Sequence, residues 1–348
     1  MKYKLFLIAM LFSFGLSGCV NSNAPLHHVS AQYTFASREK QIQQKIREYL
    51  ISNHVNGSVA AVKNNKEIFS EGVGFSDLSK RTLNSPTTTF PIASITKTIV
   101  AVCILQLQEK GKLRIDDPVS KYLPDFPKNV KIVHLLNHTS GIQPPIWHPG
   151  DRKPKDIIKE ASERGSKFSP GTKWDYNDIN YMVLGYIVER ESGVPLHEYI
   201  ERNIFKKAAM VHAGFISSEK PSSEGYIKIA DRLIQFSKLN RYLLFGCGDI
   251  EATAEDLIRF DDALMSGKLI SHQSLKELVT AGPKSKYGLG LYSTGDRVYS
   301  RGVVGGWESF HVYYKDRTSI VILLNVRDKQ CDIKKAAAGI YQIINEKS

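Results

Sequence analysis

Cysteine is scarce in this chain, with four residues among 348. One of them, Cys19, ends an apolar leader, so Cys103, Cys247 and Cys331 remain in the mature protein. Three is an odd number, and their spacings match neither a disulfide scaffold nor a zinc site. We therefore expect no structural disulfide, and we expect Cys103, which lies in an apolar run, to be a small core residue.

Several signatures of other protein classes are also missing. No internal stretch reaches the roughly 18 apolar residues that a membrane span needs. There is no Walker-type loop, no Gly-x-Ser-x-Gly elbow and no nucleic-acid-binding motif. His134 and His138 are four apart and could share a helix face, but no Glu follows His134, and Thr139-Ser140-Gly141 places His138 in a turn. We expect no metal, no cofactor and no nucleic-acid partner.

The first residues form a targeting segment. Lys2 and Lys4 precede an apolar core from Leu5 to Leu16, and the segment ends in Leu16-Ser17-Gly18-Cys19. This ending resembles the bacterial lipoprotein box, which implies cleavage before Cys19 and its lipidation; the alternative is an ordinary signal peptide. We predict a lipoprotein signal peptide at 1–18, a lipidated tether at 19–37, and a membrane-anchored protein exported to the bacterial cell surface or periplasm.

The remaining composition is that of a globular, basic protein. Hydrophobic residues make up 42% and aromatic residues 10%, which excludes a disordered chain. Loss of Lys2 and Lys4 with the leader lowers the formal charge from +12 to +10. Outside a bacterial cell, the anionic partners available are lipid headgroups, wall phosphate polymers and lipopolysaccharide. The alternative is a solvated basic surface without a specific partner.

Ser94-Ile95-Thr96-Lys97 is the most informative motif. A serine hydroxyl needs a base within hydrogen-bond reach, and residues three apart share one face of a helix. Ser-x-x-Lys occurs three times, but only Ser94 opens an apolar stretch, Ile99 to Leu107. We predict a nucleophile at the N-terminus of a buried helix; the alternative is a Ser N-cap with a solvated Lys97.

The order of the elements predicts the fold class. Strands are expected at both ends of the chain, and a mainly helical region, roughly 112–245, lies between them. We predict an α/β (α+β) domain over 38–348, with an antiparallel sheet built from both chain ends and flanked by helices. The predicted elements are a helix at 39–52, a hairpin at 57–63 and 66–74, helices at 156–164, 180–192, 196–204 and 253–266, strands at 287–292, 298–302, 309–314 and 319–326, and a closing helix at 332–345.

A second motif, Tyr176-Asn177-Asp178, stands between a turn and a helix. It can aim Tyr176 and Asp178 into a cleft, where a tyrosine beside an ammonium group can move protons. The alternative is a buried Tyr176 with a satisfied hydroxyl and an Asp178 that caps the helix.

Together these stretches resemble the superfamily of serine β-lactamases and penicillin-binding proteins, on the side of class C β-lactamases, D-alanyl-D-alanine carboxypeptidases and related esterases. The resemblance covers roughly 41–344 and implies a β-lactamase/transpeptidase-like fold. It rests on Phe90-x-x-Ala-Ser94-x-Thr-Lys97, Asp116 to Pro124, Leu135-Leu-Asn-His-Thr-Ser-Gly141, Phe168-Ser-Pro-Gly-Thr172, Tyr176-x-Asp178, Tyr181-x-x-Leu-Gly185, Gly246 to Leu257 and Tyr287-Gly-Leu-Gly290.

The resemblance also implies roles for single residues. Ser94 would be the acylated nucleophile, Lys97 would take its proton, and Tyr176 would relay protons. The backbone N–H groups of Ser94 and Val303 would form the oxyanion hole.

Two positions depart from the family pattern. Asp178 replaces the usual Asn, and Ser300-Arg301-Gly302 replaces Lys-Thr-Gly or His-x-Gly. We expect Ser300, Arg301, Gly302 and Val303 to form the substrate-binding strand, with the Arg301 side chain on its other face. Asp178 would favour the charged form of Lys97 and repel a substrate carboxylate.

We therefore expect a cell-envelope serine hydrolase that acts through an acyl-enzyme on D-alanyl amides or esters of peptidoglycan or an anionic envelope polymer. Some surface proteins of this superfamily that resemble penicillin-binding proteins share a Tyr-x-Asp variant, and relatives include esterases that remove D-alanine from wall teichoic acids. One alternative is a β-lactamase. Another is a wall-binding or sensing module whose catalysis is impaired.

Overall fold

The computed structural model describes residues 27–146, 152–216, 222–230, 232–236 and 239–346. The chain separates into two units, of which the first ends at Lys40 and the second begins at Gln41. Helix α1 (His27–Ser52) starts inside the range predicted to be a tether. The predicted signal peptide and Cys19 lie outside the described residues.

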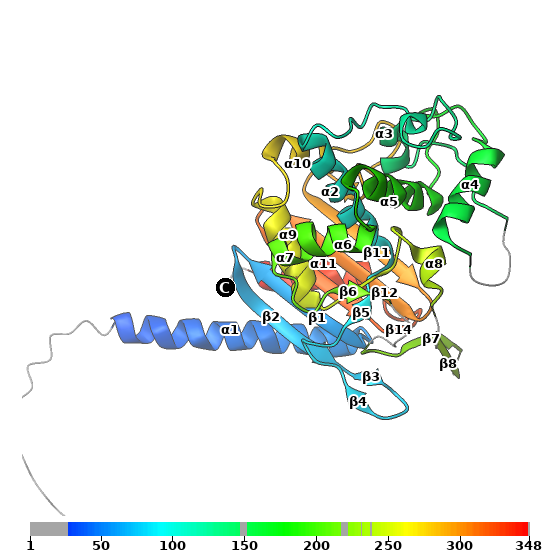
Figure 1. Ribbon diagram of the computed structural model, residues 1–348. Helices are drawn as coiled ribbons and strands as arrows, with labels where there is room; N and C mark the ends of the chain where they lie inside the picture. Colours follow the sequence, from blue (N-terminus) through cyan, green and yellow to red (C-terminus); the bar gives the residue numbers. More distant parts are fainter. Residues whose placement is uncertain (1–26, 147–151, 217–221, 231, 237–238, 347–348) are drawn as a thin grey trace, which may run out of the picture. The chain divides into compact units, whose positions relative to one another are not determined.

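An antiparallel sheet of six strands is the framework of the second unit (Figure 1). Its strand order is β10-β11-β12-β13-β1-β2, so β1 from the beginning of the chain pairs with β13 from its end, as predicted. The strands are β1 (Gly57–Lys63), β2 (Lys66–Val73), β10 (Tyr292–Ser293), β11 (Arg297–Val304), β12 (Trp307–Tyr314) and β13 (Thr318–Leu324).

The predicted hairpin of β1 and β2 turns at Asn64 and Asn65. Both residues have left-handed backbone conformations, with φ of 50° and 63°. This is the conformation of a type I′ turn, whose twist matches that of the flanking strands, and Asn tolerates it well.

The sheet is buried on both faces, which explains the continuous apolar sequence of β13. Ile320 and Ile322 pack in one hydrophobic cluster with α1 and α11, while Val321 and Leu323 pack in the other with α2 and α9. Each face of a strand receives alternate side chains, so a strand covered on both sides needs apolar residues throughout.

Helices dominate the rest of the second unit. No helix among the described residues is both long enough and apolar enough to cross a membrane. The helical segments are η1 (Ala93–Ile95), α2 (Thr96–Glu109), η2 (Val119–Lys121), α3 (Ile132–Leu136), α4 (Pro154–Arg164), α5 (Ile179–Ser192), α6 (Leu196–Ile200), η3 (Glu201–Phe205), α7 (Lys206–Ala208), α8 (Arg241–Leu244), α9 (Ala254–Met265), α10 (His272–Val279) and α11 (Ile333–Asn345).

Short strands form three small sheets beside the main one, in the orders β14-β7-β8, β3-β4 and β5-β9-β6. These strands are β3 (Phe75–Asp77), β4 (Thr82–Leu83), β5 (Phe90–Pro91), β6 (Gly214–Phe215), β7 (Gly225–Ile229), β8 (Arg232–Phe236), β9 (Ile250–Ala252) and β14 (Val326–Arg327).

Two predictions need correction. The region 112–245 is not helical to its end, because β7 and β8 form a hairpin there. Ile227, Ile229 and Ile234 are β-branched and favour strands, and β14 extends the hairpin by parallel pairing. The strand predicted at 287–292 shrinks to Tyr292 in β10, because Gly290, at a φ of 89°, turns the chain against α2.

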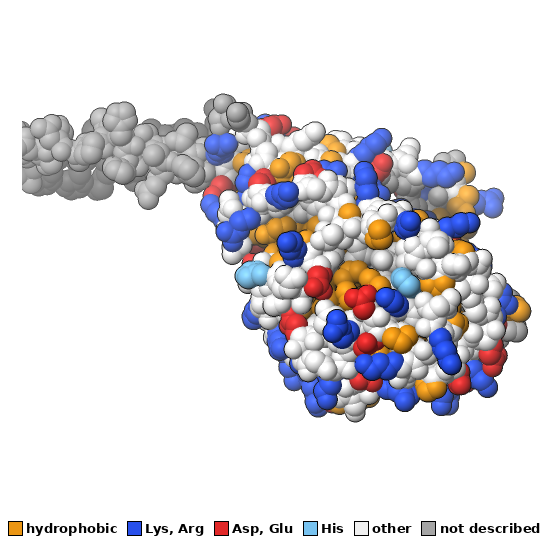
Figure 2. Space-filling view, turned by 90° about the horizontal axis from the view of Figure 1, so that it is seen from above, with side chains coloured by type: hydrophobic (Ala, Val, Ile, Leu, Met, Phe, Trp, Pro, Cys, Tyr) orange, Lys and Arg blue, Asp and Glu red, His pale blue; other side chains and the backbone are white. Residues whose placement is uncertain are grey.

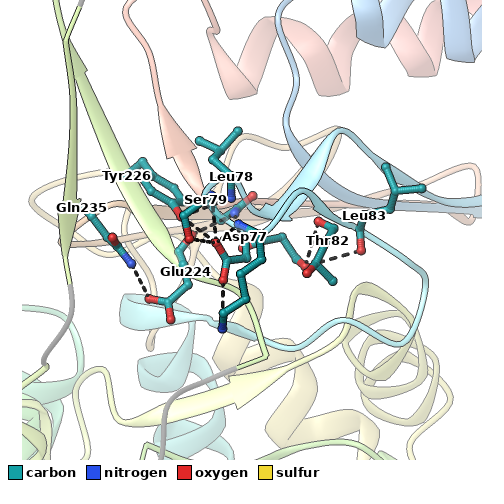
Figure 3. Close-up of polar contacts among 11 residues, drawn as sticks. Asp77, Leu78, Ser79, Thr82, Leu83, Glu224, Tyr226 and Gln235 are labelled. Carbon is teal, nitrogen blue, oxygen red and sulfur yellow. Dashed lines mark hydrogen bonds and ion pairs between the residues drawn. The ribbon is translucent and has the colours of Figure 1, made fainter.

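Figure 3 shows how the β3–β4 hairpin meets β7. Asp77 Oδ1 accepts hydrogen bonds from the Ser79 hydroxyl at 2.6 Å and the Lys80 backbone N–H at 3.1 Å, and these bonds hold the pKa of Asp77 well below its usual range. The Tyr226 hydroxyl reaches the same oxygen at 3.4 Å and accepts from the Leu78 N–H at 3.2 Å. The hairpin is therefore fastened to the strand beside it.

Asn325, between β13 and β14, holds these pieces to the main sheet. Its fully buried amide donates to the carbonyls of Phe75, Ser76 and Glu224 at 3.1, 3.1 and 2.8 Å, and its oxygen accepts from Asn56 at 2.7 Å. One side chain thus ties together three chain segments.

We predict that Asn325→Ala lowers the free energy of unfolding by about 3 kcal/mol, because buried carbonyls lose their donor. Denaturant unfolding measures the change. Gln273→Ala, on the exposed surface of α10, serves as the control and should stay within about 0.5 kcal/mol. Equal stability of the two variants would contradict the assignment.

Candidate active site

Ser94 lies in a tight turn between an extended lead-in and a buried helix. Strand β5 pairs with β9, η1 follows, and α2 begins at Thr96. Ala93 has a φ of 46°, a left-handed conformation that is uncommon for a residue other than glycine and that concentrates at functional sites. The predicted apolar helix after Ser94 is confirmed, since every residue from Thr96 to Leu107 is buried.

Lys97 is fully buried and has three hydrogen-bond acceptors around its Nζ. The nitrogen lies 2.9 Å from Ser94 Oγ, 2.8 Å from Asp178 Oδ1 and 2.8 Å from the carbonyl oxygen of Cys247. An ammonium group carries three N–H donors and no acceptor, so these three oxygens match its charged form.

The electrostatic surroundings of Lys97 keep its amine in the charged form. Burial by itself would lower the pKa of Lys97, but the carboxylate of Asp178 is the main charge that opposes this effect, and the pKa of Lys97 stays above its ordinary value. In the resting site, Lys97 therefore donates a hydrogen bond to Ser94. It must lose a proton before it can act as a base.

Asp178 does not have the helix-capping role that was the alternative considered for it. It stands at the N-cap position of α5, yet its side chain makes no capping hydrogen bond and contacts Lys97 instead. The Asp178 side chain is 61% exposed, whereas that of Lys97 is 0% exposed. One end of this ion pair is therefore accessible to a ligand, and the other is enclosed.

Tyr176 joins the same cluster. Lys97 Nζ lies 5.2 Å from the centroid of the Tyr176 ring, and this ring is 4.3 Å from that of His138 and 6.0 Å from that of Tyr287. Tyr176 is 38% exposed, so it is not the buried residue of the alternative interpretation. The structure thus brings Ser94, Lys97, Tyr176 and Asp178 together.

His138 holds the Tyr176 loop, a role that the sequence did not indicate. Its carbonyl oxygen accepts from the Asp175 N–H at 2.8 Å, and its Nδ1 accepts from the Asn177 N–H at 3.2 Å. The Asn180 amide lies 3.0 Å from the same Nδ1. Burial, and then the charge of Lys97, lower the pKa of His138 well below its ordinary value, so the ring is neutral.

Strand β11 lies directly against the Ser94 turn. A Cβ atom on Gly302 would fall 2.2 Å from the Ile92 carbonyl oxygen and 2.8 Å from the Ser94 nitrogen, so only glycine fits there. The Ser300 hydroxyl is buried and lies 2.8 Å from Thr98 Oγ1 on α2. Gly302 and Ser300 therefore fix the strand against the nucleophile turn.

Arg301 and Val303 are the alternate residues of β11. Arg301 Nε donates to Glu308 Oε1 at 2.6 Å, on the face away from Thr98, as strand alternation predicts. Val303 is 37% exposed. Its backbone N–H, with that of Ser94, remains our predicted oxyanion hole.

The arrangement can carry out acyl transfer. It contains a hydroxyl nucleophile, an amine that can take its proton, and a phenol and a carboxylate beside them. Within the described ranges, no group of three or more His, Cys, Asp or Glu side chains is placed to hold a metal ion. Cys103, Cys247 and Cys331 are buried free thiols.

The sheet, the buried Ser-x-x-Lys helix and the neighbouring Tyr-x-Asp loop define the class of serine enzymes with the β-lactamase fold. The chain matches the beta-lactamase family over residues 42–340 and belongs to that family. The resemblance drawn from its motifs is thereby confirmed, as is the predicted fold.

Two relatives and one solved structure show the range of the family around this chain. PbpX of Bacillus subtilis (strain 168), provisionally named a penicillin-binding protein, is 37% identical over 90% of this chain and 82% of its own length. A teichoic acid D-alanine hydrolase of Staphylococcus aureus is 30% identical over 82% and 74%. The crystal structure of FmtA from Staphylococcus aureus aligns with a TM-score of 0.80 and 28% identity, over 87% of this chain and 89% of that one.

We predict that His138→Asn lowers the rate constant for acylation of Ser94 about 100-fold. Loss of the ring would let the Tyr176 loop shift, and a displacement of about 1 Å suffices for such a loss. Asn accepts the left-handed backbone of His138, at a φ of 58°, but lacks the ring. Stopped-flow acylation by a fluorescent penicillin measures the rate. The control His134→Asn should stay within about twofold, and a matching rate in both variants would refute the role of His138.

Proposed function

We propose that this protein is a serine hydrolase of the cell envelope that removes D-alanine from ester links through an acyl-enzyme on Ser94. D-alanyl amides would be secondary substrates. The observation that carries the proposal is the contact between the exposed carboxylate of Asp178 and the buried Lys97. The name of the D-alanine hydrolase relative supports the same substrate class.

The proposed reaction uses the four clustered residues. Ser94 Oγ attacks the ester carbonyl as its proton passes to Lys97 in the neutral form. The carbonyl oxygen becomes negative between the N–H groups of Ser94 and Val303. The leaving alcohol takes a proton relayed through Lys97 and Tyr176, and a D-alanyl ester remains on Ser94. Water then attacks this ester and releases free D-alanine.

Asp178 favours a cationic substrate over an anionic one. The amine of a D-alanyl ester is positively charged, whereas a peptide that ends in D-alanine presents a carboxylate. With 61% of its side chain exposed, Asp178 can attract the first and repel the second. A bound ammonium would also compete with Lys97 for the same carboxylate, which would lower the pKa of Lys97 and free it to act as a base.

The location and the partner belong to this proposal as well. The leader and Cys19 support export and lipid anchoring, and the formal charge of +10 that remains without Lys2 and Lys4 suits an anionic envelope polymer as substrate. Figure 2 shows Lys and Arg side chains spread over one face of the molecule, where hydrophobic side chains gather near the middle.

Three substrates separate the proposal from its alternatives. We expect kcat/KM for a small D-alanyl ester to exceed that for D-alanyl-D-alanine peptide or nitrocefin at least about tenfold, and we expect Ser94→Ala to abolish turnover. Faster turnover of nitrocefin would identify a β-lactamase. Absence of any Ser94-dependent turnover would instead favour a binding or sensing module.

We predict two changes in Asp178→Asn. The pKa of Lys97 falls when the carboxylate is neutralised, so the acid limb of the pH profile of kcat/KM moves about one unit or more to lower pH. The preference for a free D-alanyl ester over its N-acetyl form should also shrink.

The matched control is Asp175→Asn, because Asp175 lies in the same loop and pairs with Lys167 at 2.8 Å. It should keep both the wild-type profile and the preference. Unchanged ester turnover, pH profile and substrate preference in Asp178→Asn would contradict the role that we propose for Asp178.

A further inference from the structure

A cavity of about 880 Å³ lies on the face of β11 away from Thr98. It is open to solvent and is lined by the end of β7, by β14 with the segment after it, and by the start of α11; β7, β8 and β14 appear together at one end of the main sheet (Figure 1). Charged residues line most of it: Lys228, Arg301, Glu308, Arg327, Asp328, Lys329, Asp332 and Lys334.

The three acidic side chains of this cavity are already engaged. Glu308 accepts from Arg301 at 2.6 Å, and Asp328 accepts from Lys228 at 3.0 Å. Asp332 caps α11 by accepting the backbone N–H groups of its first turn. Each of these three carboxylates therefore already has a partner within the protein.

Three cations of the cavity remain. Arg327 donates to the Gly305 carbonyl at 3.0 Å, and the Lys334 ammonium lies 5.3 Å from the centroid of the Tyr299 ring. Among the described residues, no carboxylate forms an ion pair with Arg327, Lys329 or Lys334. The cavity therefore has an unbalanced positive charge and fits an anion with several separated charges.

The cavity is next to the strand that borders Ser94. Arg301 belongs to both, because it lies between Ser300 and Gly302 on β11 and lines the cavity. Strand β10 pairs with β11 only at Val298 and Tyr299, so none of the described strands lies beside the rest of this edge. A linear chain that passes Ser94 along this edge can continue into the cavity.

We propose that this cavity binds the phosphodiester backbone of the polymer whose D-alanyl esters reach Ser94. The inference rests on the proposed function and extends it from the ester to the polymer that carries it. Guanidinium and ammonium groups are the usual partners of phosphate in proteins. The phosphates of a membrane surface share this chemistry, and the vesicle measurement below separates that source from the polymer.

The test uses the full-length chain in detergent and a glycerol phosphate oligomer with or without D-alanyl esters. In the double variant Lys329→Gln/Lys334→Gln, we expect KM for the D-alanylated oligomer to rise at least about fivefold at low salt. Its kcat, and turnover of a small D-alanyl ester, should not change. The matched control is Lys268→Gln/Lys276→Gln, which removes the same charge from exposed positions of the α9–α10 region.

Calorimetry with the oligomer that lacks D-alanine separates this proposal from the catalytic one, because binding of that oligomer requires no turnover. Weaker binding in the cavity variant alone supports the site, even if the wild type cleaves no ester. Equal binding by both double variants overturns it. So does a cavity variant that loses binding to phosphatidylglycerol vesicles but keeps full affinity for the oligomer.

Discussion

The buried ammonium group of Lys97 is the constraint on which the site depends. A charge enclosed in protein is stable only when its lost hydration is replaced by hydrogen bonds and by an opposite charge. The replacement comes from three parts of the chain: Ser94 in the turn before α2, Asp178 at the start of α5, and the carbonyl of Cys247 before β9. The hydrogen bonds of this one ammonium group therefore fix the positions of the nucleophile, the acidic residue and the Cys247 carbonyl relative to one another.

The surrounding residues make that arrangement rigid. Gly302 lets β11 approach the Ser94 turn, and the left-handed Ala93 shapes this turn. His138 holds the Tyr176 loop through its ring and its carbonyl. Since Asp178 keeps Lys97 charged, the resting site is poised for a ligand that draws the carboxylate away, which connects the proposed preference for a cationic ester with the activation of the base. The cationic cavity on the other face of β11 extends the same logic, because it would hold the anionic part of that substrate.

The sequence predicted the parts whose signals are local. The Asn64-Asn65 hairpin, the buried helix after Ser94 and the pairing of both chain ends follow from turn residues, apolar runs and element order. The hairpin of β7 and β8 was missed because its exposed residues, Leu233 and Ile234 among them, show no clear inward and outward pattern. His138 could be placed in a turn, but its contacts with the Tyr176 loop join segments about 40 residues apart, and the cavity draws on four separate segments. The spacing of residues along the sequence does not predict contacts between segments that are so far apart in the chain.

The central claim is an acyl-enzyme on Ser94, and intact-mass spectrometry of a rapidly quenched reaction with a D-alanyl ester tests it most directly. The account predicts a protein heavier by one D-alanyl group, with the modified peptide mapping to Ser94, and no such species in Ser94→Ala. Turnover that continues in Ser94→Ala, or a D-alanyl group found on another residue, would contradict it.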